Sequence, residues 1–257
     1  METPTEIAAR ILNAYDSLAP IEPVRELIKG VESAYAVQRA CVDEWVQRGR
    51  KIAGHKIGLT SKAIQTQLGV DEPDFGTLLS DMVLQDGAVV PPGRVMQPRL
   101  EGEIAFMLKS DLRGERITPE RVMAATGYVC PALEICGSRI AGWNIRIEDT
   151  IADNASAALI VLGSNRSKPT LAELARIEMK MSHNGEMVAS GRGEACLGNP
   201  ALAVAWLAET LTRLGDGLKA GEVIMSGALA KMVPAEPGSR FSADFGGFGS
   251  VSVNFAK

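Results

Sequence analysis

Apolar side chains recur every three or four residues along the first part of the chain. The first such run contains Ile7, Ile11, Leu12, Tyr15 and Leu18. A second run, from Val31 to Val46, repeats the spacing. Residues three and four positions apart share one face of a helix, so both runs predict amphipathic helices. We therefore expect an N-terminal helical extension over residues 1–50.

From Lys51 onward, shorter apolar segments alternate with glycine-rich turns. This pattern favours strands joined by loops, with buried strands expected at 128–136 and 159–162. Asn184-Gly185 separates apolar segments at 175–182 and 187–190, which is typical of a two-residue hairpin. Near the C-terminus, short connections predict antiparallel strands at 223–226, 240–245 and 250–255.

Two further helical patterns lie among these strands, at 118–126 and at 200–214. Helices thus concentrate at the front of the chain and strands at the back, which predicts an α+β class instead of a regular alternation. The length allows one large core, and no linker or repeat divides the remainder. We expect residues 51–257 to form a single β-rich catalytic domain.

Composition excludes several classes of partner. The net charge is -4, and the 27 basic residues are scattered among 31 acidic ones, so no basic stripe is available for nucleic acid. No apolar run is long enough to span a bilayer, and the N-terminus lacks the features of a signal peptide. We expect a cytoplasmic protein with no membrane partner. Its four cysteines, without a Cys-x-x-Cys pair, predict reduced core thiols.

Three glutamates stand out because they lie in strongly apolar segments. Glu101 and Glu103 are two positions apart, which aims both side chains to one face of a strand, and a neighbouring strand could bring Glu134 to them. Converging carboxylates repel one another unless a cation neutralises them, and Mg²⁺ or Mn²⁺ prefers such hard oxygen ligands. In the alternative interpretation, the glutamates face solvent on an edge strand and pair with Arg99 or Arg139.

Several segments together resemble one family, the 2-keto-4-pentenoate hydratases (2-hydroxypenta-2,4-dienoate hydratases) within the fumarylacetoacetate hydrolase superfamily. They run in order from about Val31 to the C-terminus: Gly54-His-Lys-Ile-Gly-Leu-Thr, Gln67-Leu-Gly-Val-Asp-Glu-Pro-Asp-Phe-Gly-Thr-Leu, Gln97-Pro-Arg-Leu-Glu-Gly-Glu-Ile-Ala, Pro131-Ala-Leu-Glu-Ile-Cys-Gly-Ser-Arg-Ile, Ala152-Asp-Asn-Ala-Ser, Ser190-Gly-Arg-Gly and Ser226-Gly-Ala-Leu. The resemblance implies a β-rich roll of mostly antiparallel strands, like the fumarylacetoacetate hydrolase C-terminal domain, with an N-terminal helical part. It also implies a homo-oligomer, which we expect to associate with the next enzyme of its pathway.

Residue by residue, the resemblance implies a role for each matching position. Its metal ligands fall on Glu101, Glu103 and Glu134, for Mg²⁺ or Mn²⁺. Its catalytic residues fall on Lys56, Asp74 and Ser156, and its substrate-binding residues on Thr60, Ser156, Ala228 and Leu229. Without the family, the favoured interpretations are a surface lysine at a strand end for Lys56 and a turn residue for Asp74. The alternative for Ser156 is a helix cap or a turn. We assign His55 no catalytic role.

The family reaction adds water to 2-hydroxypenta-2,4-dienoate and gives 4-hydroxy-2-oxopentanoate, a step in the meta-cleavage breakdown of aromatic compounds. Two alternatives within the superfamily are a 4-oxalocrotonate decarboxylase and a hydratase of a longer dicarboxylate, 2-oxohept-4-ene-1,7-dioate. The segments Asp74-Phe-Gly-Thr-Leu and Gly137-Ser-Arg-Ile-Ala-Gly-Trp look like hydratase versions. Two other classes stay open: a metal-free lyase in which Lys56 forms an imine, and a non-catalytic partner subunit.

Overall fold

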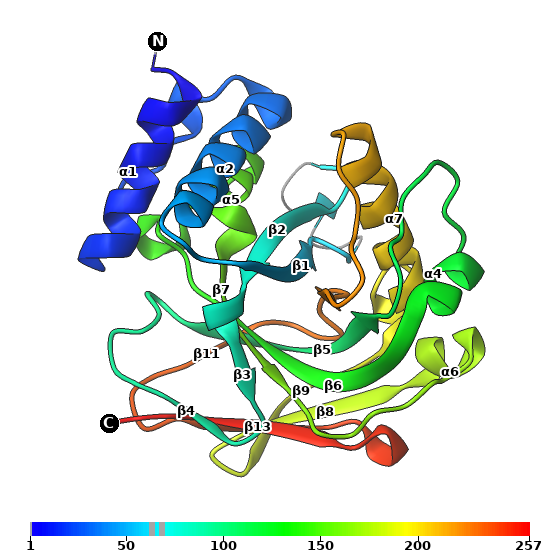
Figure 1. The fold of residues 1–257 in the computed structure, drawn as a ribbon. Coiled ribbons are helices and arrows are strands. Elements are labelled where there is room, and N and C mark those ends of the chain that lie inside the picture. Colours follow the sequence, from blue (N-terminus) through cyan, green and yellow to red (C-terminus); the bar gives the residue numbers. More distant parts are fainter. Residues whose placement is uncertain (1, 62–64, 67–69) are drawn as a thin grey trace.

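The computed structural model describes residues 2–61, 65–66 and 70–257, which form two β-sheets with helices around them (Figure 1). The first three residues of the family segment at 67–78 lie outside this range, so its structure is known from Val70 onward. The mixture of helices with mostly antiparallel sheets confirms the α+β class.

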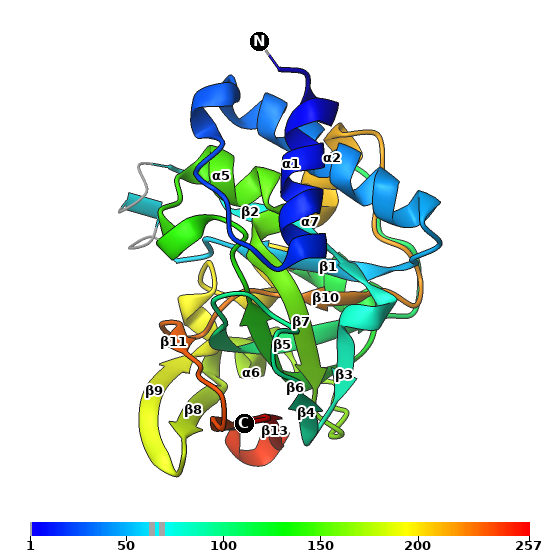
Figure 2. The ribbon, with the colours of Figure 1, turned by 90° about the vertical axis from the view of Figure 1, so that its left-hand side faces the viewer.

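The two N-terminal helices are confirmed. Helix α1 (Pro4–Ser17) begins at Thr3, whose side chain and that of Glu6 cap each other's backbone N–H groups. Helix α2 (Gly30–Gln47) packs against α1 and against α5 (Ile147–Ala152). Of the apolar positions that predicted α1, Ile7, Ile11 and Leu12 are buried and Tyr15 is partly buried. Leu18 follows the helix in a left-handed conformation and is exposed. Figure 2 shows these helices together at one end of the molecule.

The larger sheet combines strands from residues 52–162 with two strands from near the C-terminus. Its order is β2-β1-β10-β5-β6-β7-β3, and β11 pairs with β5 beside this path. The pairs β1–β10 and β3–β7 are parallel, and the other described pairs in this sheet are antiparallel. The strands are β1 (Ile52–Gly58), β2 (Asp74–Leu79), β3 (Val83–Gln85), β5 (Arg99–Leu108), β6 (Thr126–Cys136), β7 (Ala157–Leu162), β10 (Val223–Met225) and β11 (Val233–Pro234).

The smaller sheet has the order β4-β13-β12-β8-β9 and lies at the opposite end from α1 (Figures 1 and 2). Its β4–β13 pair is parallel, and the others are antiparallel. The hairpin at Asn184-Gly185 is confirmed as the turn between β8 and β9. The strands are β4 (Ala88–Val90), β8 (Glu178–His183), β9 (Glu186–Arg192), β12 (Arg240–Asp244) and β13 (Ser250–Phe255).

Two expectations about these strands were wrong. The first hairpin strand does not start at Ala175, because α6 (Leu171–Arg176), which begins with a capping box between Thr170 and Glu173, takes up that residue. The C-terminal strands do not form one antiparallel group. Although β12 and β13 pair as expected, β10 inserts into the other sheet between β1 and β5. Closeness along the chain did not decide its partners.

The remaining helices, α4 (Pro119–Ala125) and α7 (Pro200–Arg213), confirm the other two helical patterns. They contact each other beside the larger sheet, on the side away from α1 (Figure 1). All four cysteines are buried free thiols, as expected. Among the described residues, no helix has both the length and the apolar character required to cross a membrane.

Candidate metal and proton-transfer site

The glutamate cluster is built by the pairing of β5 with β6. Glu101 lies directly opposite Glu134 in this antiparallel register, and Glu103 follows on the same face of β5. Glu103 and Glu134 are 0% exposed and Glu101 is 8% exposed. The solvent-facing interpretation was therefore wrong. The arginines that it invoked are engaged elsewhere: Arg139 pairs with Asp153, and Arg99 lies over the ring of Trp143.

The structure adds a residue that the sequence analysis did not select for this cluster. Glu101, Glu134 and Cys136 each offer one ligand atom, and these atoms lie within 4.8 Å of one another. Glu103 is not part of that group, and its Oε2 accepts a hydrogen bond of 2.9 Å from the Gly227 N–H. The spacing of Cys136, two positions after Glu134 on one strand face, was the signal in the sequence that could have revealed it.

The hydrogen bonding and the pKa values of the carboxylates indicate a cation site. Glu103 Oε1 and both Glu134 oxygens are buried without a hydrogen-bond partner in the described part of the chain. Buried polar atoms are rarely left without a partner, and an ionised carboxylate can only accept. Burial and the negative charge of Glu134 raise the pKa of Glu101 to about 8 and that of Glu103 well above its usual range. A divalent cation would satisfy these oxygens and remove the repulsion.

Lys56 brings a positive charge to the cluster from β1. Its Nζ lies 3.2 Å from Glu134 Oε1. Because β10 and β5 separate β1 from β6, a flat sheet would hold these two strands about 14 Å apart. The sheet must therefore curl into a roll with the site on its concave face. Burial acts to lower the pKa of Lys56, but the surrounding carboxylates, Glu134 foremost, raise it well above its usual range.

Asp74 reaches the same place from β2. It lies opposite Gly58 in the antiparallel β1–β2 pair, and its Oδ2 accepts a hydrogen bond of 3.2 Å from the Thr150 hydroxyl. Asp74 is buried, and that burial raises the pKa of its carboxyl group. A side chain at Gly58 would overlap Asp74 Oδ1 and approach Lys56 Nζ to 3.4 Å. Because Gly58 has no side chain, it leaves the space that Asp74 and Lys56 occupy.

Ser156 lies in a short turn with an unusual backbone. Three consecutive residues, Asn154, Ala155 and Ser156, have φ of 55°, 49° and 52°, which is costly for residues with a side chain. The turn is held from both sides. Asn154 exchanges two hydrogen bonds with the backbone of Thr77, and Asp153 is paired with the buried Arg139. The Ser156 hydroxyl donates to Asp153 Oδ2 at 3.2 Å. This supporting network was not predicted from the sequence.

The segment that carries two of the expected substrate-binding residues, Ala228 and Leu229, lies next to Glu103 through Gly227. A side chain at Gly227 would overlap Thr60, and Gly227 is the residue that donates to Glu103. Leu229 is buried and donates its N–H to the Gly102 carbonyl, while Ala228 is partly exposed. The structure thus brings Thr60 and the segment at 226–229 to the glutamate cluster, from opposite ends of the chain.

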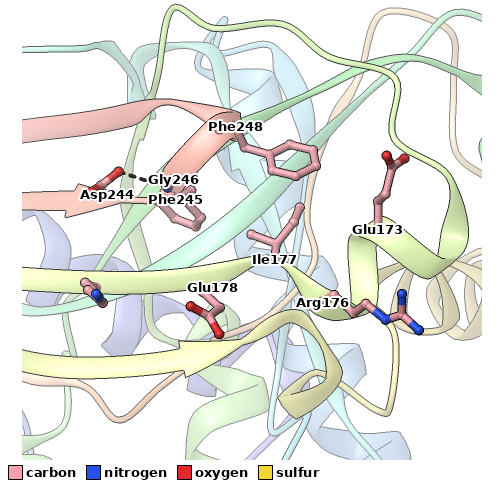
Figure 3. A pocket seen from close by; sticks show the side chains of 10 residues that line it. Glu173, Arg176, Ile177, Glu178, Asp244, Phe245, Gly246 and Phe248 are labelled. Carbon is pink, nitrogen blue, oxygen red and sulfur yellow. Dashed lines mark hydrogen bonds between the residues drawn. The ribbon is translucent and has the colours of Figure 1, made fainter.

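Two cavities of the described chain lie away from the glutamate cluster. One of about 350 Å³ lies between α6 and the β12–β13 connection, where Ile177 and Phe248 meet charged neighbours (Figure 3). Another, of about 560 Å³, is lined by α2, α7 and His55. The side chain of His55 alternates with that of Lys56 along β1, so it faces away from the glutamates. Its Nδ1 lies 3.7 Å from Glu222 Oε2.

Gly58→Ala is expected to separate Asp74 from Lys56, because the added methyl group occupies the space between them. A misplacement of about 1 Å can cost roughly 10²-fold in rate, so we expect a fall of that order in turnover by steady-state kinetics. Gly247→Ala is the matched control, since a methyl group there meets no atom within 4 Å. A Gly58→Ala variant as active as this control would contradict the arrangement.

Removal of divalent ions is expected to make stability depend on pH through Glu101. Its pKa is 4.5 in an ordinary setting and about 8 in the fold. Between these values the folded protein keeps a proton that the unfolded chain releases, so the free energy of unfolding falls as the pH rises from about 4.5 to about 8. Thermal unfolding in EDTA measures this fall. Glu101→Gln should show a smaller fall, and equal slopes would contradict the assignment.

Comparison with known proteins places the chain in a family. Residues 46–256 match the family described as fumarylacetoacetate (FAA) hydrolase C-terminal. The chain is 47% identical to a 2-keto-4-pentenoate hydratase of Paraburkholderia xenovorans, over 97% of this chain and 94% of that protein. It is 48% identical to a 2-hydroxyhexa-2,4-dienoate hydratase of Comamonas testosteroni, over 88% of this chain and 87% of that protein.

A solved structure is also similar. The 4-oxalocrotonate decarboxylase from Pseudomonas putida G7, complexed with magnesium and adipate, matches with a TM-score of 0.93 and 34% identity, over 98% of this chain and 97% of that one. A second structure of that enzyme, complexed with calcium and acetate, matches with a TM-score of 0.91. The fold, the segments and the relatives agree, and the chain belongs to the 2-keto-4-pentenoate hydratase family within the fumarylacetoacetate hydrolase superfamily.

Proposed function

We propose that this protein is a metal-dependent hydro-lyase. It adds water to 2-hydroxypenta-2,4-dienoate or a close analogue and gives 4-hydroxy-2-oxopentanoate, in the meta-cleavage breakdown of aromatic compounds. The observation that carries the proposal is the buried cluster of Glu101, Glu134 and Lys56, in a chain 42–48% identical to hydratases over most of its length. The unsatisfied carboxylates suit cation binding, and the buried lysine beside them suits proton transfer.

Glu101, Glu103 and Glu134 are the residues that would hold the cation. Their oxygens are hard ligands, and three of those oxygens lack hydrogen-bond partners in the described chain, which fits Mg²⁺ or Mn²⁺. A bound divalent ion supplies Lewis acidity and a template for the 2-oxo acid head of the substrate. The magnesium in the structure of the similar decarboxylase is consistent with this choice.

Lys56 and Asp74 are the groups that would move protons. Ketonisation of the dienol places a proton on C5, and the water that attacks C4 loses one. Both groups are buried in the cluster: the carboxylates around Lys56 raise its pKa, and burial raises the pKa of Asp74. One member of this pair delivers the proton and the other accepts it.

Ser156 and the segment around Gly227 would position the substrate. The Ser156 hydroxyl is held by Asp153 in a turn that the Arg139 ion pair and Thr77 keep rigid. A hydroxyl fixed in this way can orient a substrate carboxylate or the attacking water with little loss of entropy. Thr60, Ala228 and Leu229 would form the wall beside Glu103.

A decarboxylase acting on 4-oxalocrotonate is the second candidate, favoured by the TM-score of 0.93 to such an enzyme. The shared fold suits either reaction. Identity is 34% to the decarboxylase but 47% to a hydratase over a similar share of the chain, and the segments at Asp74 and Gly137 look like hydratase versions. A hydratase of the longer dicarboxylate would need a further cationic side chain to hold its second carboxylate.

One experiment separates these functions. Purified protein with Mg²⁺ is mixed in turn with 2-hydroxypenta-2,4-dienoate and 4-oxalocrotonate, while the dienol absorbance is followed and the products are identified. Formation of 4-hydroxy-2-oxopentanoate supports the hydratase, and release of carbon dioxide from the second compound supports the decarboxylase. Activity that survives EDTA, with borohydride trapping of the substrate on Lys56, would replace both with an imine mechanism.

We also propose a division of the chain and an assembly. Residues 1–50 form a helical extension and residues 51–257 the catalytic domain, which the start of the family match at residue 46 supports. The protein forms a homo-oligomer and associates with the enzyme that consumes its product. Analytical ultracentrifugation, alone and with that enzyme, tests both statements.

A further inference from the structure

Cys136 differs from the other cysteines in what it faces. Its Sγ lies 3.9 Å from Glu101 Oε2, whereas the thiols of Cys41 and Cys196 point to backbone carbonyls. Cys136 is 3% exposed and ends β6, two residues after Glu134. Strand alternation therefore aims its side chain to the same face as the carboxylate of Glu134. The site therefore offers a metal ion a sulfur ligand in addition to its carboxylate oxygens.

The distances suit direct coordination by such a thiol. Zinc bonds of about 2.3 Å to sulfur and 2.1 Å to oxygen, at tetrahedral angles, separate the two ligand atoms by about 3.6 Å. The observed separation of 3.9 Å between Cys136 Sγ and Glu101 Oε2 requires only a small adjustment. Glu134 also contributes one atom to the group within 4.8 Å, and neither of its oxygens has a hydrogen-bond partner in the described chain. Three protein ligands are thus available for one ion.

We propose that Cys136 gives this site a second coordination mode for thiophilic divalent ions. Mg²⁺ or Mn²⁺ binds through carboxylates alone, whereas Zn²⁺ or Co²⁺ binds through Glu101, Glu134 and the Cys136 thiolate, whose proton passes to solvent. The inference rests on the proposed function in placing a divalent ion at this cluster. Because both modes use Glu101 and Glu134, a thiophilic ion competes with Mg²⁺ for the site.

Cobalt is the probe that tests this coordination. Co²⁺ is added to the metal-free protein, and a thiolate-to-cobalt charge-transfer band is sought in the near-ultraviolet. The wild type and Cys130→Ser are expected to show the band. Cys130 is a matched control because it is a buried cysteine of the same strand that lies outside the group of ligand atoms. Cys136→Ser is expected to lose it. Binding of Co²⁺ to the wild type without the band would overturn the inference.

Zinc affinity gives a second readout. Cys136→Ser is expected to bind Zn²⁺ at least roughly tenfold more weakly than Cys130→Ser, with a much smaller change in Mg²⁺ affinity, because sulfur contributes only to the thiophilic mode. Equal losses for the two metals would mean that Cys136 merely positions the glutamates, and would also overturn the inference.

Two further measurements keep the test decisive. If the serine variant does not fold, X-ray absorption of the zinc-loaded wild type should show a sulfur neighbour at about 2.3 Å, and a shell of oxygen and nitrogen alone would refute the proposal. Hydratase turnover with Mg²⁺ is measured in parallel on the wild type. If the cobalt band appears but the enzyme shows no turnover, the proposed function is wrong and the thiol ligand is supported. If turnover is observed but the band is absent, the proposed function is supported and the thiol ligand is wrong.

Discussion

Glu134→Gln should lose divalent-cation binding and turnover together. Glu134 lies opposite Glu101, contacts Lys56 and has both oxygens without hydrogen-bond partners in the described chain, so it is central to the cluster. Loss of a residue that only supports a ligand costs about 10- to 100-fold in metal affinity, and we expect loss of this ligand to cost at least the upper end of that range. Isothermal titration calorimetry of the metal-free protein with Mg²⁺ measures this loss of affinity.

The control is Glu186→Gln, the same change at an exposed glutamate of the β8–β9 hairpin. It should bind Mg²⁺ like the wild type. Thermal unfolding adds a second readout, because Mg²⁺ should raise the midpoint of the wild type and of the control but not that of Glu134→Gln. If Glu134→Gln retained both its Mg²⁺ affinity and its turnover, the ligand assignment would be wrong.

Lys56→Met is expected to lower turnover by about 10²- to 10⁴-fold, the usual contribution of a positioned proton-transfer group. Methionine has a similar length and apolar stem, so packing on β1 is largely kept. Removal of the positive charge takes away its repulsion of a cation, so Mg²⁺ affinity should hold or rise. The kinetic constants and the Mg²⁺ affinity are measured on one preparation, and turnover should fall without a fall in Mg²⁺ affinity.

Two variants make this prediction sharper. Lys51→Met changes an exposed lysine just before β1 and should leave turnover unchanged. Lys56→Arg keeps the charge but cannot release its proton at accessible pH, so it should remain impaired if Lys56 exchanges a proton with the substrate. Full activity in Lys56→Arg would show that only the charge matters. Near-normal turnover in Lys56→Met would remove Lys56 from the mechanism.

Local periodicity was sufficient for much of the fold. The spacing at three and four positions correctly predicted α1 and α2, and the turn at Asn184-Gly185 correctly predicted the β8–β9 hairpin. These features depend on interactions between residues that are close in the sequence, which do not require the rest of the fold. The expectation failed at Ala175, where the Thr170 capping box started a helix in a segment that was interpreted as strand.

The pairing of distant strands was beyond the reach of such patterns. A family resemblance pointed to Lys56 and Asp74, but only the β1–β2 register shows that Gly58 leaves room for the pair. The left-handed turn at Ser156 depends on Arg139 and Thr77, each contributed by a different part of the chain. Contacts of this kind are set by packing across the whole domain.

By itself the sequence determined that Glu101 and Glu103 share one face of an apolar strand, because side chains alternate along any strand. Only the tertiary structure decided that Glu134 lies opposite Glu101, that Cys136 joins them and that Lys56 reaches them across a curled sheet. The physical reason is that strand register and sheet curvature minimise the free energy of the entire core, whereas alternation is a property of a few adjacent residues.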